Sequence, residues 1–355
     1  MNLKKFGHYE QLEKFMLENN LDNSKVGRVI AEHKERYIVK TIQGEIDAEV
    51  TGSLRFAARG REDFPSVGDW VTLSSEDSDF AVIHKILPRF SVVKRQSVGQ
   101  FGEVQIIATN IDYAFLVQAV DRDFNINRLE RYLTLCYSSK VLPIVVLSKV
   151  DLIDELQLSE ILASIKIRIS DVSIITVSNE IENGYEAISA IIEEGKTYCI
   201  LGSSGVGKST LLNNISGQTI MKTDTIGQKT HRGRHVTSHR ELIVLENGGI
   251  LIDTPGMREM ELADSSEGLE VTFDRIVHQS QNCKFKNCTH TNEIGCSVIN
   301  AVEKGEIDQA TYKNYLKMEK ENAYFELTTV EKRHKSKEFG KMLKNVKKDM
   351  KRNYY

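Results

Sequence analysis

Alternating apolar and polar residues mark the first part of the chain as a set of short β-strands. A strand points successive side chains to opposite faces, so a single apolar face gives an alternating pattern. Five such runs fall within about seventy residues, a spacing typical of a small barrel. We expect an N-terminal β-barrel, with the OB-fold as the leading candidate. The runs are 27–30, 37–40, 46–50, 69–73 and 80–86.

The pattern changes between Val104 and Pro255, where apolar, β-branched runs alternate with helical segments. Continuously apolar runs are typical of strands that are covered on both faces, as in a parallel sheet with helices on each side. We therefore expect a central α/β domain. Its strands are predicted at 105–109, 113–117, 142–147, 174–177, 197–201, 242–245 and 250–252.

Both ends of the chain have helical patterns. Leu12, Phe15, Met16 and Leu17 have the spacing of one helix face, which predicts a short amphipathic helix ahead of the barrel. After about residue 265 the strand signals fade, and the sequence becomes helical and increasingly basic. The sequence thus predicts four segments: a helical extension at 1–24, the barrel at 25–98, the α/β domain at 99–264 and a C-terminal domain at 265–355.

Composition narrows the class of protein without naming a partner. A chain of 355 residues is long enough for several domains with separate cores. The net charge of −3 gives no global attraction to nucleic acid, so any such contact depends on local basic segments. The sequence has no apolar run long enough to span a membrane and no signal-peptide pattern, so we expect a cytoplasmic protein without membrane contact.

A glycine-rich loop follows the predicted strand at 197–201 and opens a helix. Its pattern is Gly, four residues and then Gly-Lys-Ser, which lets backbone N–H groups surround phosphate oxygens at a helix N-terminus. We expect Lys208 to reach the β- and γ-phosphates and the Ser209 hydroxyl to bind Mg²⁺. The predicted phosphate loop comprises Gly202, Ser203, Ser204, Gly205, Val206, Gly207, Lys208, Ser209 and Thr210.

A second loop motif, Asp253-Thr254-Pro255-Gly256, ends the predicted strand at 250–252. We expect the Asp253 carboxylate to hold Mg²⁺, usually through water, and the Gly256 N–H to sense the γ-phosphate. A Pro-Gly pair alone would be an ordinary turn. The position of the motif, about 45 residues after the phosphate-loop lysine, favours the nucleotide interpretation.

Ser148, Lys149 and Asp151 follow the apolar strand at 142–147. A carboxylate can accept hydrogen bonds from the N1 and N2 donors of guanine, whereas adenine offers no such pair, so Asp151 is the candidate for base recognition. Ser178, which follows the next predicted strand, is expected to lie against the base. The competing interpretation of this Lys-x-Asp pattern is a solvated loop.

These motifs occur in an unusual order. In an ordinary GTPase the phosphate loop precedes the Lys-x-Asp motif. Here Lys149 comes before the phosphate loop, with the strands at 174–177 and 197–201 between them. The order indicates a circularly permuted GTPase, in which the same fold begins and ends at a different point.

Three of the five cysteines lie close together, near a histidine. Cys283, Cys288, His290 and Cys296 offer three thiolates and one imidazole, which suits a closed tetrahedral Zn²⁺ site. A closed site leaves no position for substrate, so we expect one structural zinc ion. Scattered reduced cysteines are the alternative.

The permuted motif order, the phosphate loop, the segment 227–237, the Asp253 motif and the cysteine cluster together resemble the RsgA family, bacterial GTPases that depend on the small ribosomal subunit. The resemblance covers nearly the whole chain. It implies an RNA-binding OB-fold, a permuted GTPase domain and a zinc-binding domain. It also implies GTP and GDP as ligands, and the small ribosomal subunit and its rRNA as partners in late subunit maturation. We expect a monomer.

The resemblance also concerns the residues that would orient the attacking water and sense Mg²⁺, which lie between the phosphate loop and the Asp253 motif. Met257 stands where Ras-like enzymes place the Gln that orients the attacking water. The resemblance implies that His235 takes this role when the partner orders its segment. The run His235-Val236-Thr237-Ser238 departs from the more Thr-rich run of the family, which leaves both Thr237 and Thr230 as candidates to sense Mg²⁺, and we favour Thr237. At Ser148 this chain departs from the Asn or Thr that is usual there.

Two other functions stay open from the residues alone. Met257 favours an RNA-binding scaffold that uses GTP only as a conformational ligand. A P-loop kinase or ATPase would require adenine to compete at the base site, against the interpretation of Asp151. The basic residues within 332–352 can follow an RNA backbone by counterion release, and can equally form a solvated helix.

Overall fold

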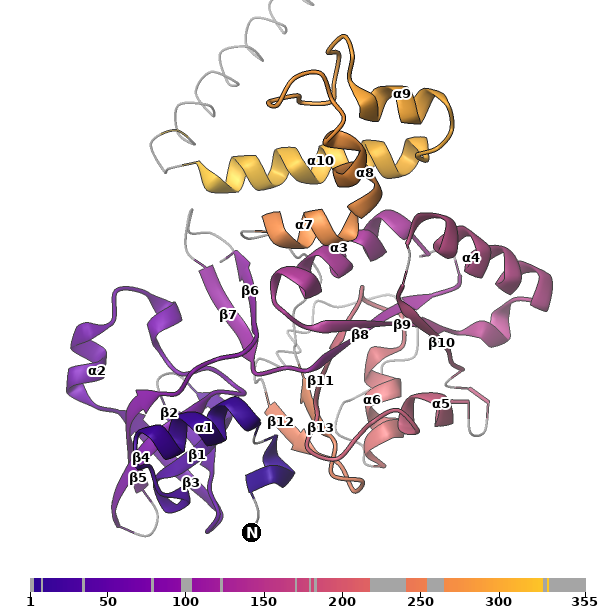
Figure 1. The fold of residues 1–355 in the computed structure, drawn as a ribbon. Helices are drawn as coiled ribbons and strands as arrows, with labels where there is room; N and C mark the ends of the chain where they lie inside the picture. Colours follow the sequence, from indigo (N-terminus) through magenta and orange to yellow (C-terminus); the bar gives the residue numbers. More distant parts are fainter. Residues whose placement is uncertain are drawn as a thin grey trace, which may run out of the picture.

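The computed structural model of the chain describes residues 3–7, 9–33, 36–77, 80–96, 104–121, 124–169, 171–178, 180–181, 184–217, 241–253, 265–327 and 331. Figure 1 shows a barrel, a central α/β layer and a group of helices that stacks on one side of that layer. The predicted fold class is confirmed: the chain combines an N-terminal β-barrel, an α/β domain and a mostly helical C-terminal region.

The N-terminal barrel contains the strands β1 (Val26–His33), β2 (Arg36–Lys40), β3 (Glu45–Val50), β4 (Trp70–Asp77) and β5 (Phe80–Ile86), with a short helix α2 (Gly52–Ala57) after β3. Their order in the sheet is β1-β2-β3-β5-β4, and β4 also pairs with β1, so the barrel is closed. Closure leaves the barrel without a free sheet edge. All five predicted strands are confirmed. The interior holds buried residues that include Val29, Val39, Ala48, Val71 and Ile83.

The N-terminal segment packs onto the barrel. It contains the 3-10 turns η1 (Leu3–Phe6) and η2 (Asn23–Lys25) and the helix α1 (Glu10–Glu18). Leu12 and Met16 of α1 are buried against Trp70 of the barrel, as their helical spacing predicts. The prediction that Leu17 lies on the same helix face is wrong. Leu17 follows Met16 directly, so its side chain points about 100° away around the helix axis, and it is 76% exposed.

A separate two-stranded hairpin lies between the barrel and the α/β layer. Its strands β6 (Val92–Gln96) and β7 (Val104–Thr109) pair with each other in antiparallel register. The assignment of 105–109 to the α/β sheet is therefore wrong. Consecutive residues Ile106, Ile107 and Ala108 are all buried, so this strand has the continuous apolar pattern of a parallel sheet without belonging to one.

The central layer is a sheet of six strands in the order β10-β9-β8-β11-β13-β12, and only β12 runs antiparallel to its neighbour. One pairing, between Ala31 of β1 and Glu241 of β12, joins this sheet to the barrel. The strands are β8 (Tyr113–Ala119), β9 (Leu142–Ser148), β10 (Ser173–Thr176), β11 (Thr197–Leu201), β12 (Glu241–Val244) and β13 (Ile250–Asp253).

Helices cover both faces of this sheet, as the apolar strands predict. Ala114 and Leu116 of β8 face a core formed with the helices α3 (Ile126–Ser138) and α4 (Glu155–Arg168). Phe115 and Val117, which alternate with them, face the opposite core, formed with the helices α5 (Glu186–Ser189) and α6 (Lys208–Ser216). The loops that carry the predicted nucleotide motifs therefore extend from a sheet that is packed on both faces.

The C-terminal region is helical: α7 (Ser266–Thr272), α8 (Asp274–Ser280), α9 (Ser297–Glu303) and α10 (Gln309–Glu326). Its small core includes Leu269, Phe273, Val298 and Met318. In Figure 1, α7 and α10 lie above α3, on the face of the central sheet away from α6. Within the described ranges, no helix is both long and apolar enough to cross a membrane.

Arg28 ties four segments together at the junction of the barrel and the α/β layer. Its side chain, on β1, is only 1% exposed. It donates to the carbonyl oxygens of Phe6, Gly68 and Asn110 and to the Thr197 hydroxyl at the start of β11. Burial lowers the pKa of Arg28 to about 10, and the Asp112 carboxylate opposes this shift.

We expect Arg28→Ala to lower the free energy of unfolding by roughly 3 kcal/mol or more, because each buried acceptor left without a donor costs about 1–3 kcal/mol. Trp70 is the single tryptophan, is fully buried and lies 5.9 Å from the Arg28 guanidinium, so its fluorescence reports chemical unfolding at this junction. The matched control is Arg36→Ala. Arg36 is 74% exposed and pairs with Glu49, so about 1 kcal/mol or less is expected. Equal losses in the two variants would contradict the role of Arg28.

Candidate functional site

The loops that carry the predicted motifs meet at one edge of the central sheet. β8, β9, β11 and β13 are parallel, so their carboxyl ends lie at this same edge. From β8 the chain proceeds through α3 to β9 on one side, and from β11 through α6 to β12 and β13 on the other. The carboxyl ends of β8 and β11 therefore form a topological switch point, where open α/β sheets bind ligands.

The phosphate loop connects β11 to α6 at this switch point. Gly202 has a φ of +157°, and a Cβ atom there would lie 2.4 Å from the Val117 carbonyl oxygen of β8, so only glycine fits. Gly207, which immediately precedes α6 as its N-cap residue, has a φ of 90°. The ammonium group of Lys208 donates to the carbonyl oxygens of Gly202 and Ser203, at 2.8 and 2.5 Å. Ser209 and Thr210 occupy the first turn of α6.

The Lys-x-Asp loop lies directly against the phosphate loop. The Ser148 side chain is fully buried at the end of β9, and its hydroxyl donates to the Val206 carbonyl oxygen at 2.7 Å. This bond joins loops that are 58 residues apart in the chain. The short Ser148 side chain therefore still holds the two loops together in place of the usual Asn or Thr.

Lys149 and Asp151 are each fixed by a neighbouring strand end. Lys149 has a φ of 61°, and its ammonium group pairs with the Asp121 carboxylate at 2.8 Å. The Ser178 hydroxyl, after β10, donates to an Asp151 carboxylate oxygen at 2.5 Å. The structure thus brings together the predicted residues Ser148, Lys149, Asp151 and Ser178. Asp121 was missed, although its position just after β8 was the signal that could have found it.

The remaining predicted nucleotide residues are placed only in part. Asp253 is the last residue of β13, whose carboxyl end lies beside that of β11. His235, Thr237 and Gly256 lie outside the described residues, so their predicted roles stay predictions.

The three cysteines and the histidine of the predicted zinc site converge after α8. Their ligand atoms all lie within 4.8 Å of one another. The Cys283 sulfur lies 3.9 Å from the Cys296 sulfur and 3.6 Å from His290 Nδ1, and His290 Nδ1 lies 3.4 Å from the Cys296 sulfur. Tetrahedral ligands at the usual Zn–S and Zn–N distances would be about 3.8 Å (S to S) and about 3.6 Å (S to N) apart. The four residues fit a zinc ion.

The surrounding residues support the ligands. The backbone N–H groups of Ser297 and Ile299 point to the sulfurs of Cys283 and Cys296, at 3.3 and 3.4 Å, and hydrogen bonds of this kind orient the ligands of a metal site. The Tyr312 hydroxyl of α10 donates to the His290 carbonyl oxygen at 2.5 Å. This metal site thus anchors the loop before α9 to the end helix α10.

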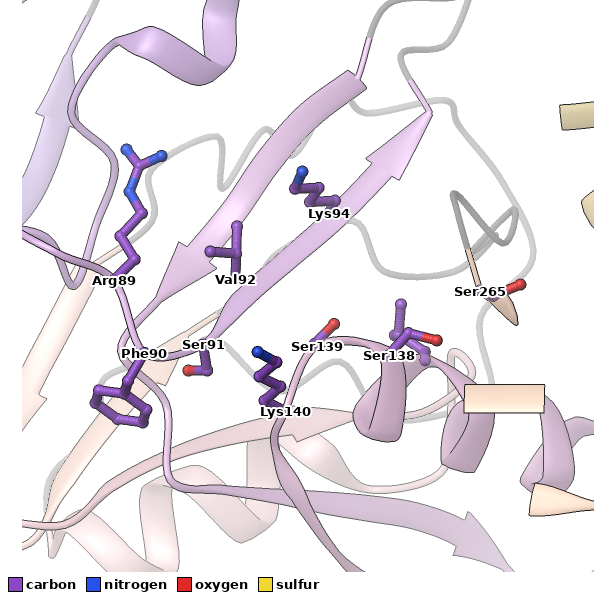
Figure 2. A pocket seen from close by; sticks show the side chains of 10 residues that line it. Arg89, Phe90, Ser91, Val92, Lys94, Ser138, Ser139, Lys140 and Ser265 are labelled. Atoms are coloured by element: carbon purple, nitrogen blue, oxygen red, sulfur yellow. The ribbon is translucent and has the colours of Figure 1, made fainter. Parts of the chain in front are cut away.

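A cavity of about 240 Å³ lies apart from these loops, between β6 and the C-terminal end of α3 (Figure 2). Two of its three cations are already paired: Arg89 with Asp69, at 2.6 Å, and Lys94 with Glu62, at 2.8 Å. The third cation that lines it is Lys140, which has no ion pair among the described residues. The cavity therefore has weaker chemistry for phosphate than the glycine-rich loop at the sheet edge.

The site defines a class of protein: a circularly permuted P-loop GTPase, in which the Lys-x-Asp loop after β9 precedes the phosphate loop after β11. The sequence profile of the RsgA GTPase family matches residues 86–263. A second profile, that of ABC transporters, matches residues 185–353, a stretch that contains the phosphate loop.

Named proteins match over almost the full length. The small ribosomal subunit biogenesis GTPase RsgA 1 of Oceanobacillus iheyensis is 40% identical over 330 residues, which cover 92% of this chain and 93% of that protein. The RsgA 2 protein of Lactiplantibacillus plantarum is 41% identical over 329 residues, covering 91% and 90%. This chain therefore belongs to the RsgA family of GTPases. The resemblance to that family that the sequence motifs indicate is confirmed.

Solved structures agree with this assignment. YjeQ from Thermotoga maritima is 27% identical, with a TM-score of 0.64, over 84% of this chain and 98% of that chain. YloQ, described as a circularly permuted GTPase, is 28% identical, with a TM-score of 0.61, over 86% and 96%. Each match covers more than four fifths of this chain, so neither is confined to the central layer.

Proposed function

We propose that this protein hydrolyses GTP during late maturation of the small ribosomal subunit, and that the subunit stimulates the reaction. The observation that carries the GTPase part is the Ser148–Val206 hydrogen bond, which joins a guanine-type loop to a phosphate loop at one crevice. The ribosomal part rests on the relatives, which are named small ribosomal subunit biogenesis GTPases.

The phosphate loop supplies binding and charge. Backbone N–H groups of 202–207 surround the phosphates, while Lys208 neutralises charge on the β- and γ-phosphates. We assign the Ser209 hydroxyl and the Asp253 carboxylate to the Mg²⁺ that accompanies GTP. Gly256 is assigned to sensing of the γ-phosphate. The support for these roles is the loop's position between β11 and the N-terminus of α6.

The guanine base is read by Asp151. The Ser178 hydroxyl occupies one oxygen of this carboxylate and so orients the side chain, and the carboxylate accepts from the N1 and N2 donors of guanine. Lys149, held by Asp121, places its aliphatic stem beside the base. Adenine has no matching donors, which argues against a P-loop kinase or ATPase.

We expect Asp151→Asn to weaken GTP binding by roughly 100-fold or more and to favour xanthosine triphosphate, because the new amide can donate to the xanthine O2. Equilibrium binding of GTP, xanthosine triphosphate and ATP measures this switch. Asp154→Asn is the matched control: Asp154 caps α4, and asparagine caps equally well. Unchanged GTP affinity in Asp151→Asn would remove the base-site assignment.

We assign the catalytic step to the segment before β12. His235 orients the attacking water in place of the absent Gln, since the thioether of Met257 cannot do so, and Thr237 senses Mg²⁺. An RNA-binding scaffold that only binds GTP is the competing function, and Met257 is the feature that favours it. Multiple-turnover release of phosphate distinguishes an enzyme from such a scaffold.

Contact with rRNA is assigned to the barrel at 25–98 and to the metal-binding and basic domain at 265–355, which flank the GTPase domain at 99–264. The zinc ion holds the C-terminal domain in shape and takes no part in hydrolysis, because all four ligand positions belong to the protein. We propose that the protein acts as a monomer in the cytoplasm. Co-sedimentation with purified small subunits, stronger with a non-hydrolysable GTP analogue than with GDP, tests this assignment.

A further inference from the structure

The N-terminal end of helix α3 contacts the phosphate loop. The Arg128 guanidinium, in the first turn of α3, donates to the Ser203 hydroxyl at 2.9 Å. The Ser203 carbonyl oxygen accepts from Lys208 on the other side of the loop. Ser203 is thus held twice, by Lys208 through its main chain and by Arg128 through its side chain.

The same turn of α3 contacts the C-terminal helix α10. Arg131, three residues after Arg128, forms a two-pronged ion pair with Glu321, at 2.6 and 3.0 Å. Beside it, the Glu130 carboxylate is 1% exposed and accepts from Asn314 of α10 and from Arg168 of α4. Burial raises the pKa of the Glu130 carboxyl, and Arg168 opposes this shift.

α3 is held by its neighbours near both ends. The Gln118 side chain of β8 exchanges two hydrogen bonds with the backbone of Asn125, which caps the helix. Farther along, α7 packs so closely that a Cβ atom at Gly268 would lie 2.0 Å from the Thr134 carbonyl oxygen. Hydrogen bonds and ion pairs that join the two ends of such a helix to other segments form the kind of contiguous network that carries energetic coupling between sites.

We propose that Arg128 is a positioning residue that couples the state of the phosphate loop to the C-terminal helices through α3. This inference rests on the proposed GTPase function. A shift of Ser203 when nucleotide binds is passed by Arg128 to α3, and by Arg131 to α10. Linkage makes the coupling reciprocal: a partner that moves α10 changes nucleotide affinity.

The coupling is tested by GTP and GDP affinities of the full-length protein in two double-mutant cycles. We expect Arg128→Ala to weaken GTP binding about tenfold, a typical effect of losing a charged hydrogen bond. In a Ser203→Ala background the same change has no further effect, because the shared bond is already gone. A tenfold loss that persists without the Ser203 hydroxyl would overturn the proposed contact.

The second cycle pairs Arg128→Ala with Arg131→Ala. Arg128 contacts the phosphate loop and Arg131 contacts α10, so the two side chains lie at the two ends of the proposed coupling through α3. We expect Arg131→Ala to change the ratio of GTP to GDP affinity by about threefold in the wild type, and not at all once Arg128 is absent. Glu321→Gln removes the charge of the same ion pair while keeping the shape of the side chain. It replaces Arg131→Ala in the cycle if Arg131→Ala is less stable than the wild type. Lys317→Ala, at an exposed position of α10, is the control and leaves the ratio unchanged.

If Arg128→Ala and Arg131→Ala change the ratio of GTP to GDP affinity additively, the proposed coupling through α3 is wrong, while the GTPase function is unaffected. A wild-type protein that fails to bind GTP would instead contradict the proposed function itself. A melting temperature for each variant separates coupling from general loss of structure, because a purely structural role of Arg131 lowers stability equally whether or not Arg128 is present.

Discussion

Replacing Lys208 by alanine is expected to abolish GTP turnover, with a fall of roughly 1,000-fold or more, because the charge on the β- and γ-phosphates loses its main partner. The ammonium group already lies inside the phosphate loop, bonded to the carbonyl oxygens of Gly202 and Ser203. It therefore needs little rearrangement to meet the phosphates. Phosphate release under saturating GTP measures the effect.

The matched control for Lys208→Ala is Lys166→Ala. Lys166 is exposed on α4, near the C-terminal end of that helix, and its loss should leave turnover unchanged. Both variants should unfold at temperatures close to that of the wild type, because Lys208 is only partly buried. Turnover retained in Lys208→Ala would mean that the loop at 202–209 is not the phosphate site.

Cys288→Ala is expected to remove the zinc ion and the ordered structure around α9, since structural zinc binding and local folding are coupled. Elemental analysis should fall from about one equivalent of zinc to almost none. Protease sensitivity should rise between α8 and α9, where the ligands lie. GTP binding should persist, because the nucleotide loops belong to the central sheet.

Cys136→Ala is the matched control for the zinc prediction. Cys136 lies in the core on α3, and burial raises the pKa of its thiol well above the usual value, so it stays protonated and binds no metal. Its variant should keep a full equivalent of zinc. Carefully prepared wild-type protein without metal would contradict the site, whatever the behaviour of the variants.

Local chemistry made much of this protein predictable from sequence. The phosphate loop, the Lys-x-Asp loop and the cysteine cluster each place their functional groups within a few neighbouring residues, so spacing alone identified them. The barrel strands were equally clear, because short runs rich in apolar and β-branched residues recur at close spacing in this part of the chain. Their closure through the β1–β4 pairing is a contact between distant segments, and only the fold class suggested it.

The error at β7 is local: this strand has the apolar pattern of a central strand and yet pairs with β6, the strand just before it in the chain. The omissions have a different physical cause, because they depend on neighbours that are distant in the chain. Asp121, after β8, contacts Lys149, which is 28 residues away in the chain. Arg128, on α3, contacts Ser203, which is 75 residues away. Side-chain periodicity carries no information about such encounters.

The most direct test of the account measures GTP turnover by the full-length protein with and without purified small ribosomal subunits. The account predicts slow turnover alone, strong stimulation by the subunit, and loss of most of that stimulation in His235→Ala with GTP affinity kept, the pattern of an interaction made in the transition state. Equal stimulation of His235→Ala would remove the catalytic role of His235. A wild-type protein whose turnover the subunit leaves unchanged would contradict the central claim.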